Sequence, residues 1–168
     1  FDADVQTFEA VPPARFREQT AALADDPAVA RVGYGELSGV SFNGTLAETV
    51  VLADGGNPLQ PTIGSGRAAV ADDEVVLGTS ALADAGVGLG DTVTAEGPAG
   101  TRELTVVGTA AYPMLGNQTD TTRLATITRG AARSLGAEPM SNQAFVDLRP
   151  GHDAEELRDI ADAVGGDV

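Results

Sequence analysis

Cysteine, lysine and tryptophan are all absent from this chain of 168 residues. Without cysteine there is no disulfide framework, no thiolate metal site and no cysteine nucleophile. Aromatic residues make up only 4% of the sequence, which leaves few rings to stack on a sugar substrate. No run of about 18 apolar residues occurs, so these residues contain no membrane-spanning helix.

Basic residues are also scarce: ten arginines stand against 25 acidic residues, and the net charge is −15. Displacing counterions from nucleic-acid phosphates needs a basic stripe, so this balance argues against a nucleic-acid partner. It equally disfavours adhesion to an anionic membrane surface. The simplest interpretation of the acidity is solubility.

Candidate catalytic and metal-binding residues are few. His152 is the only histidine, and no G-x-S-x-G elbow accompanies it, so we interpret it as a residue of a surface turn. A hard cation would have only carboxylates to bind. The acidic groups are Asp72-Asp73-Glu74 and the set Asp153, Glu155, Glu156, Asp159 and Asp162. The first is interpreted as the end of a loop and the second as the solvated face of a helix. We predict no catalytic residue, no cofactor and no metal.

The glycine run Gly86-Val87-Gly88-Leu89-Gly90 does not predict a phosphate site. A phosphate cradle needs a strand before the glycines and a helix after them, so that helix N–H groups meet the anion. Here the pattern places a helix before the run and a strand after it. The run is therefore interpreted as a corner.

The first third of the chain predicts a helix followed by a long hairpin. The helix begins at Val11-Pro12-Pro13 and ends before Pro27, and it places Phe16, Thr20 and Leu23 on one face. An alternating strand follows from Ala28, with Val32, Tyr34, Val40 and Phe42 in one phase. The dipeptide Asn43-Gly44 is a strong hairpin signal, because both turn positions favour positive φ. The return strand Thr45–Ala53 places Leu46, Val50 and Leu52 in one phase.

Residues Asp54 to Asp73 are rich in glycine and proline and are predicted to be a loop between subdomains. The stretch Glu74–Pro113 then predicts a small curled sheet without an obvious catalytic group, which favours a structural or mechanical role. Its expected parts are a strand at Glu74–Leu77, a helix capped by Thr79 or Ser80, the glycine corner, and strands at Asp91–Glu96 and Leu104–Thr109.

The last third predicts a strand at Leu124–Thr128, a helix at Arg129–Leu135 ended by Gly136, and a strand at Asn142–Arg149. A final helix follows, with Asp153 as its N-cap and Glu156 three residues later in a capping box. Its apolar face consists of Leu157, Ile160, Ala161 and Val164.

One pattern carries a family resemblance. The order EVVLG…ALA…GVGLGDTVT…G…ELTVVGTAAYP, clearest over Asp72–Pro113, resembles the extracytoplasmic domain of MacB-type, FtsX-like permeases of ABC transporters. In that family a helix is followed by a GD-x-V corner and a strand that ends in V-V-G. The resemblance implies an α+β fold in which an α/β porter-like layer, made of a helix-hairpin and a strand-helix, is split by an inserted, mostly-β subdomain.

On this resemblance, residues 1–66 and 137–168 form the porter-like subdomain and residues 67–136 form the insertion. Asp153–Val164 matches the last helix of the porter layer. The sequence departs from the family pattern at one point, because no strand is predicted within Phe1–Glu9.

The function implied is that of a non-catalytic domain outside the bacterial cell membrane. Its partners would be a cytoplasmic ATPase subunit, a second permease copy or second extracytoplasmic domain, and a lipoprotein or envelope-protein substrate that receives ATP-driven motion. The chain starts at Phe1 without methionine, so we expect apolar spans of about 20 residues before Phe1 and beyond Val168 in the parent protein.

Two other classes stay open at this point. One is a secreted or periplasmic ligand- or protein-binding module, and the other is a hydrolase with unrecognised carboxylates. The candidate partner contact consists of Tyr112, Met114 and Leu115, which are apolar residues beside a loop rich in Asn, Thr and Gly. The competing interpretation is that this segment packs back onto its own subdomain.

Overall fold

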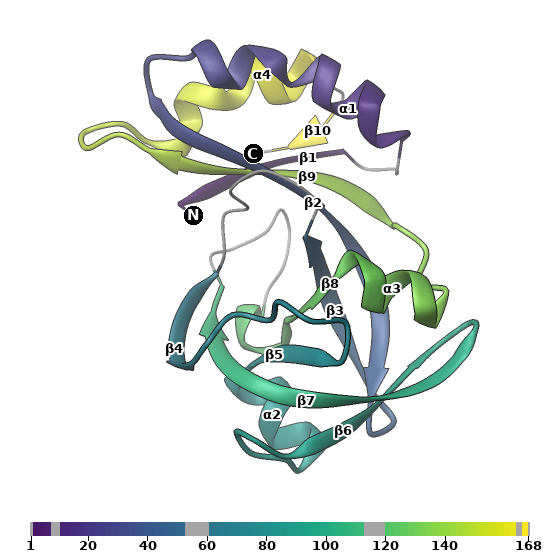
Figure 1. The fold of residues 1–168 in the computed structure, drawn as a ribbon. Helices are drawn as coiled ribbons and strands as arrows, with labels where there is room; N and C mark the ends of the chain where they lie inside the picture. The colour runs from purple at the N-terminus through teal and green to yellow at the C-terminus, as the bar shows by residue number, and fades with distance from the viewer. Residues whose placement is uncertain (1, 8–10, 53–60, 113–119, 164–165, 168) are drawn as a thin grey trace.

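The computed structural model describes residues 2–7, 11–52, 61–112, 120–163 and 166–167. They form a strand-rich α+β fold with short helices (Figure 1). The strands are β1 (Ala3–Thr7), β2 (Val29–Phe42), β3 (Thr45–Leu52), β4 (Thr62–Gly66), β5 (Glu74–Gly78), β6 (Thr92–Gly97), β7 (Gly100–Ala111), β8 (Ala125–Thr128), β9 (Ser141–Leu148) and β10 (Gly166–Asp167). The helices are α1 (Pro13–Gln19), α2 (Thr79–Ala85), α3 (Arg129–Leu135) and α4 (Arg158–Ala163), with 3₁₀ turns at Ala21–Asp25, Thr121–Arg123 and Ala154–Leu157.

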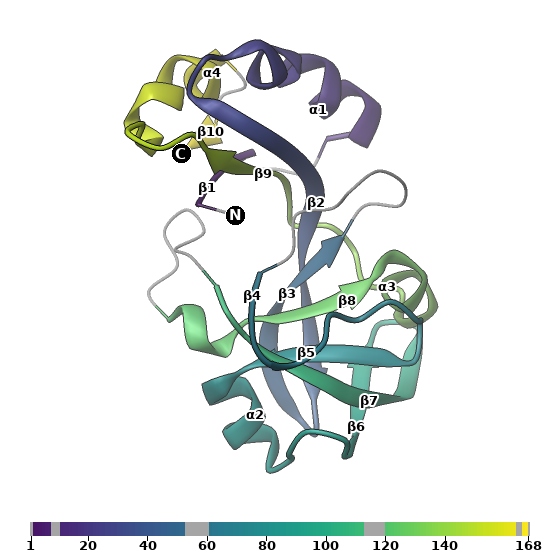
Figure 2. The same ribbon diagram turned by 60° about the vertical axis from the view of Figure 1, so that its left-hand side comes forward.

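All the described strands belong to one continuous sheet. Its order is β10-β1-β9-β2-β3-β8-β5-β7-β4, and β6 pairs with both β2 and β7. The pairs β3–β8 and β5–β7 are parallel and the others are antiparallel. Figure 2 shows how this sheet bends so that the fold divides into two lobes.

The helical lobe consists of β1, β9, β10, residues 29–35 of β2, and the helices α1 and α4, which cover one face of these strands (Figure 1). Its buried apolar core is Val5, Phe16, Leu23, Val29, Ala144, Val146, Leu157 and Ala161. Both ends of the described chain lie in this lobe, since Gln6 of β1 pairs with Asp167 of β10.

The prediction that Phe1–Glu9 contains no strand was wrong. All five residues of β1 are buried, because the strand lies between β9 and β10. Its polar side chains find partners there: Gln143 donates to Gln6 at 3.0 Å. Polar residues in a central strand hide the alternating pattern that sequence analysis depends on.

The predicted first helix exists but changes type along its length. Phe16, Thr20 and Leu23 are all buried, as the helical spacing predicted. The α-helix ends at Gln19, the Thr20 hydroxyl donates to the Phe16 carbonyl at 2.8 Å, and a 3₁₀ turn follows. Near the C-terminus the predicted capping box of Asp153 and Glu156 is confirmed.

The β lobe comprises residues 36–52, 61–112 and 120–135. Its main core contains Val40, Phe42, Val51, Val75, Leu77, Val93, Leu104, Val106, Ile127 and Leu135. Strand β2 links the two lobes, because it pairs with β9 over Val29–Leu37 and with β3 over Gly35–Phe42.

Two predictions in the β lobe need correction. The Asp54–Asp73 segment was predicted to be loop, yet Thr62–Gly66 forms β4, an exposed edge strand that pairs with β7. Helix α2 has Gly78 as its N-cap and no side-chain capping bond, so neither Thr79 nor Ser80 caps it. Gly86 ends α2 in the left-handed conformation, as its position after the helix predicted.

Candidate functional site

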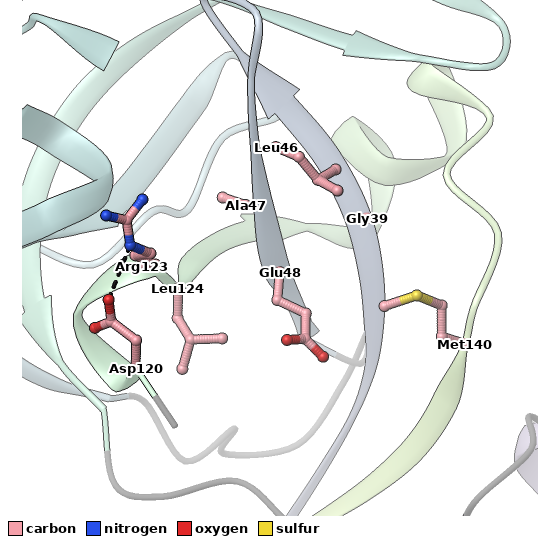
Figure 3. Close-up of a pocket in the computed structure, with 8 residues that line it drawn as sticks. All are labelled: Gly39, Leu46, Ala47, Glu48, Asp120, Arg123, Leu124 and Met140. Carbon is pink, nitrogen blue, oxygen red and sulfur yellow. Dashed lines mark hydrogen bonds and ion pairs between the residues drawn. The ribbon is translucent and has the colours of Figure 1, made fainter. Parts of the chain in front are cut away.

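A groove opens on one face of the β2–β3 hairpin, with a cavity volume of about 430 Å³ (Figure 3). Its walls come from the hairpin, from Asp120–Leu124 and from the segment just before β9. These three parts of the chain are distant in sequence, so the groove exists only in the folded protein.

The hairpin turn sets which side chains face the groove. Asn43 (φ 50°) and Gly44 (φ 81°) form the predicted two-residue turn. The resulting register pairs Gly39 with Glu48 and Ser41 with Leu46, which places Glu48 and Leu46 on one face of β3. Because Gly39 has no side chain, the floor of the groove beside them stays open.

The groove has an apolar part. Leu46 is 70% exposed and Met140 is 49% exposed, and both line the groove together with the fully buried Leu124. Single exposed apolar residues are ordinary on protein surfaces. Two that line one cavity mark a surface that another molecule can cover.

Glu48 carries a charge among these apolar side chains of the groove. Its carboxylate lies between Leu124 and Met140 in Figure 3. Partial burial raises the pKa of Glu48 above its ordinary value. No hydrogen bond or ion pair joins Glu48 to another residue in the described part of the chain. Its acceptor capacity is therefore available to a ligand.

Among the described residues that line the groove, Arg123 is the only cation, and acidic residues already pair with it. Arg123 forms ion pairs with Asp120 at 2.8 Å and with Asp84 at 2.5 Å. The Thr122 hydroxyl, the Thr122 N–H and then Arg123 hold the pKa of Asp120 below its usual range. Negative charge is therefore in excess among the described residues of the groove.

Of the three residues in the predicted partner contact, the structure describes only Tyr112. Tyr112 is only 6% exposed, and its hydroxyl is 2.8 Å from that of Thr126. Burial raises the pKa of the Tyr112 hydroxyl. Tyr112 thus packs back onto its own subdomain, which was the competing interpretation. Met114 and Leu115 lie outside the described residues, and their contact with a partner stays a prediction.

Sequence reasoning missed Leu46, Glu48 and Met140 as site residues. Leu46 was placed in one phase with Val50 and Leu52, and these three do share a face, but only the last two are covered. A signal was present, because Glu48 interrupts this apolar phase with a charge.

The other predicted groups take structural positions. His152 is exposed, with Nδ1 2.9 Å from a carboxylate oxygen of Glu156. Asp72 accepts a hydrogen bond of 2.5 Å from the Thr128 hydroxyl, and Glu74 pairs with Arg67. In the part of the chain that the structure describes, no three histidine or acidic residues are grouped so that they could hold a metal ion.

None of the helices among the described residues has the length and apolar character needed to cross a membrane.

Comparison with known proteins identifies the fold. No family model matches the sequence, and no curated protein matches it either. The extracellular domain of the noncanonic ABC-type transporter YknZ from Gram-positive bacteria superposes with a TM-score of 0.50 at 14% identity, covering 94% of this chain and 88% of that one. This chain has the fold of an extracytoplasmic ABC-permease domain.

Two further solved structures are similar with lower scores. The periplasmic region of MacB from Actinobacillus actinomycetemcomitans gives a TM-score of 0.49 at 12% identity, over 96% of this chain and 84% of that one. A domain of a putative permease from Porphyromonas gingivalis gives 0.47 at 16% identity, over 92% and 74%. The similarity to the YknZ domain confirms, at the level of the fold, the predicted resemblance to the extracytoplasmic domains of this transporter class.

Proposed function

We propose that this chain is the non-catalytic extracytoplasmic domain of a bacterial ABC transporter permease. In this role it transmits motion, driven by a cytoplasmic ATPase subunit, to an exported substrate or to an envelope partner such as a lipoprotein. The observation that carries the proposal is the continuity of β2, which passes without a break from the helical lobe into the β lobe.

Strand β2 has the length and stiffness that transmission of motion requires. Its 14 residues, at about 3.3 Å each, span roughly 45 Å. Both ends of the described chain lie in the helical lobe. A displacement applied at that lobe therefore has a stiff, hydrogen-bonded path to the far end of the molecule.

Contacts at the junction of the lobes resist independent movement. Arg129 of α3 forms an ion pair with Glu36 of β2 at 3.1 Å, and this mostly buried pair anchors β2 to the β lobe at the point where the strand enters it. Phe145 of β9 is fully buried among residues of the β lobe such as Leu37 and Leu52. These contacts support motion of the two lobes as one body.

The finer architecture is part of the proposal. The porter-like α/β layer of residues 1–66 and 137–168 would comprise the helical lobe together with the β2–β3 hairpin and β4, and residues 67–136 would form the inserted β-rich subdomain. The separate core of the helical lobe supports this division. Residues of β3 such as Ala47 and Val51 pack in the main core of the β lobe, so the hairpin serves both parts.

The position in the membrane is tested by the parent reading frame. We expect an apolar span of about 20 residues on each side of these 168 residues, and an ATPase gene nearby. A parent protein with a secretory signal peptide and no spans would contradict the permease role. It would favour the second candidate, a secreted or periplasmic binding module, which the groove at Glu48 supports.

Transmission of motion is tested by distance measurements on the assembled transporter. These 168 residues contain no cysteine, so within them a spin label attaches only at introduced sites, and cysteines in the other parts of the transporter are replaced first. We expect a label at Arg102→Cys in the β lobe to change its distance to the same label in a second permease copy when ATP is added. A transporter with an inactivated ATPase is the control. An unchanged distance during active turnover would contradict the lever, even with the membrane position established.

A further inference from the structure

We propose that the groove on the β2–β3 hairpin binds an amphiphilic organic cation, with an ammonium group paired to Glu48 and an apolar body lying on Leu46 and Met140. The ligand class is a small molecule that carries one amine on an aliphatic or similarly apolar skeleton.

The size and apolar walls of the groove fit such a body. Its volume of about 430 Å³ falls within the range of about 300–1,000 Å³ that is common for small-molecule sites. Leu46 and Met140 are exposed without a ligand, and Leu124 forms an apolar wall. Covering these side chains removes apolar surface from water, which favours binding.

The charge of the groove selects a cation. Glu48 has no partner among the described residues, and Arg123 is held by Asp120 and Asp84. An anionic ligand would meet the charges of Glu48 and Asp120, whereas an ammonium group gains a charge-assisted hydrogen bond from Glu48. A metal ion fits less well, because a hard cation such as Ca²⁺ takes about six to eight oxygen ligands and Glu48 is the one unpaired carboxylate among the described residues of the groove.

Three probes that share the same apolar tail separate the contribution of the head-group charge from the contribution of the tail. Octylamine, octanol and octanoate share their apolar chain and differ in head group, so titration of the ¹⁵N-labelled chain with each compares cation, neutral and anion directly. We expect octylamine to bind most tightly and octanoate most weakly. The shifted amide signals should belong to residues 39–48, 120–124 and 140.

Variants assign the two halves of the site. Glu48→Gln keeps the shape of the side chain and should weaken octylamine binding about tenfold, the loss of a hydrogen bond to a charged group. Leu46→Ser should weaken octylamine and octanol alike. Glu18→Gln removes the same charge from an exposed position on α1 and should leave binding unchanged.

Several outcomes would overturn the proposal. Equal binding of octanoate and octylamine would remove the role of charge, and an unaltered affinity in Glu48→Gln would remove the role of that residue. If Glu18→Gln lost as much octylamine affinity as Glu48→Gln, the net charge of the protein alone would attract the amine. The Leu46→Ser variant, altered at an exposed position, keeps the test decisive if Glu48→Gln does not fold. Binding is measured on the chain itself, so its failure leaves the permease role untouched.

Discussion

The ring of Phe145 in β9 lies directly against Gly35 in β2, where the two lobes meet. A Cβ atom on Gly35 would stand 2.8 Å from Cε2 of Phe145 and 2.7 Å from the carbonyl oxygen of Val51. Real Cβ atoms do not approach other atoms this closely, so the absence of a side chain at Gly35 allows the junction to close.

Gly35→Ala should therefore destabilise the protein. The added methyl group must displace either a buried ring or a backbone carbonyl, and overpacking of this kind costs about 1–3 kcal/mol. Urea unfolding measures the change. Gly39→Ala is the matched control in the same strand, because its Cβ would meet Cδ1 of Leu46 at an ordinary 3.5 Å. Equal losses in the two variants would show that the contact with Phe145 is not the cause.

Glu74 should make stability depend on pH in the acid range. Its carboxylate accepts hydrogen bonds from Arg67 at 2.8 Å, the Val70 N–H at 2.9 Å and the Ala71 N–H at 3.1 Å. The hydrogen bond from Arg67 is the largest cause that lowers the pKa of Glu74 to about 2. Because the folded pKa lies below the unfolded value, this contribution is complete above the unfolded pKa of about 4.3 and is lost as the pH falls towards 2.

Glu74→Gln should accordingly lower the free energy of unfolding at pH 7 by about 1.5–3 kcal/mol. The difference from the unaltered protein should shrink steadily between about pH 5 and pH 2. Thermal unfolding monitored by circular dichroism at a series of pH values measures it. Glu96 is exposed and its side chain has no hydrogen-bond or ion-pair partner among the described residues, so Glu96→Gln should show neither effect. A difference that stays constant down to pH 2 would contradict the role of the ionised carboxylate.

Tyr112 and Thr126 should be energetically coupled. Their hydroxyl groups are 2.8 Å apart in a buried setting, so removing one leaves the other without its partner. Tyr112→Phe and Thr126→Val should each cost about 1–3 kcal/mol, and the double variant should cost less than their sum. Chemical unfolding of all four proteins completes the cycle. Strict additivity would show that the bond contributes nothing.

Asn43 should stabilise the β lobe beyond its role in the turn. Its Nδ2 donates to the Ala85 carbonyl at 2.9 Å, and its Oδ1 accepts from the Thr94 N–H at 2.9 Å. Asn43→Gly retains the positive φ but loses both bonds, so it should cost about 1–2 kcal/mol in urea unfolding. Gly44→Asn changes the other turn position, where a Cβ meets nothing within 4 Å, and should have a smaller effect. A larger loss of stability in Gly44→Asn than in Asn43→Gly would contradict the bridging role of the Asn43 side chain.

Local signals were sufficient for much of the secondary structure. The helix at Arg129–Leu135 has the predicted bounds, the hairpin turns at Asn43-Gly44, and the capping box of Asp153 and Glu156 is present. Each depends on residues within a few positions of one another, where side-chain chemistry acts directly on the backbone. The order of these elements was also sufficient to indicate the permease-domain fold, which the structural comparison confirms.

Strands that lack such signals were decided by tertiary pairing. Residues Ala3–Thr7 become β1 because β9 and β10 supply hydrogen-bond partners on both sides. Thr62–Gly66 becomes β4 because β7 pairs with it from more than 40 positions away. Backbone pairing of this kind leaves no period in the side chains when both faces carry small or polar residues.

For the groove, too, the sequence predicted one part and the tertiary structure decided the other. Sequence alternation correctly placed Leu46 on one face of β3 with Val50 and Leu52, but not whether that face is covered along its length. Whether the face around Leu46 is covered depends on Leu124 and Met140, which belong to later parts of the chain. Alternation fixes the direction in which a side chain points, because it follows from the geometry of one strand. Whether that side chain is buried depends on which other segments pack against the same face of the strand, and only the tertiary structure decides this.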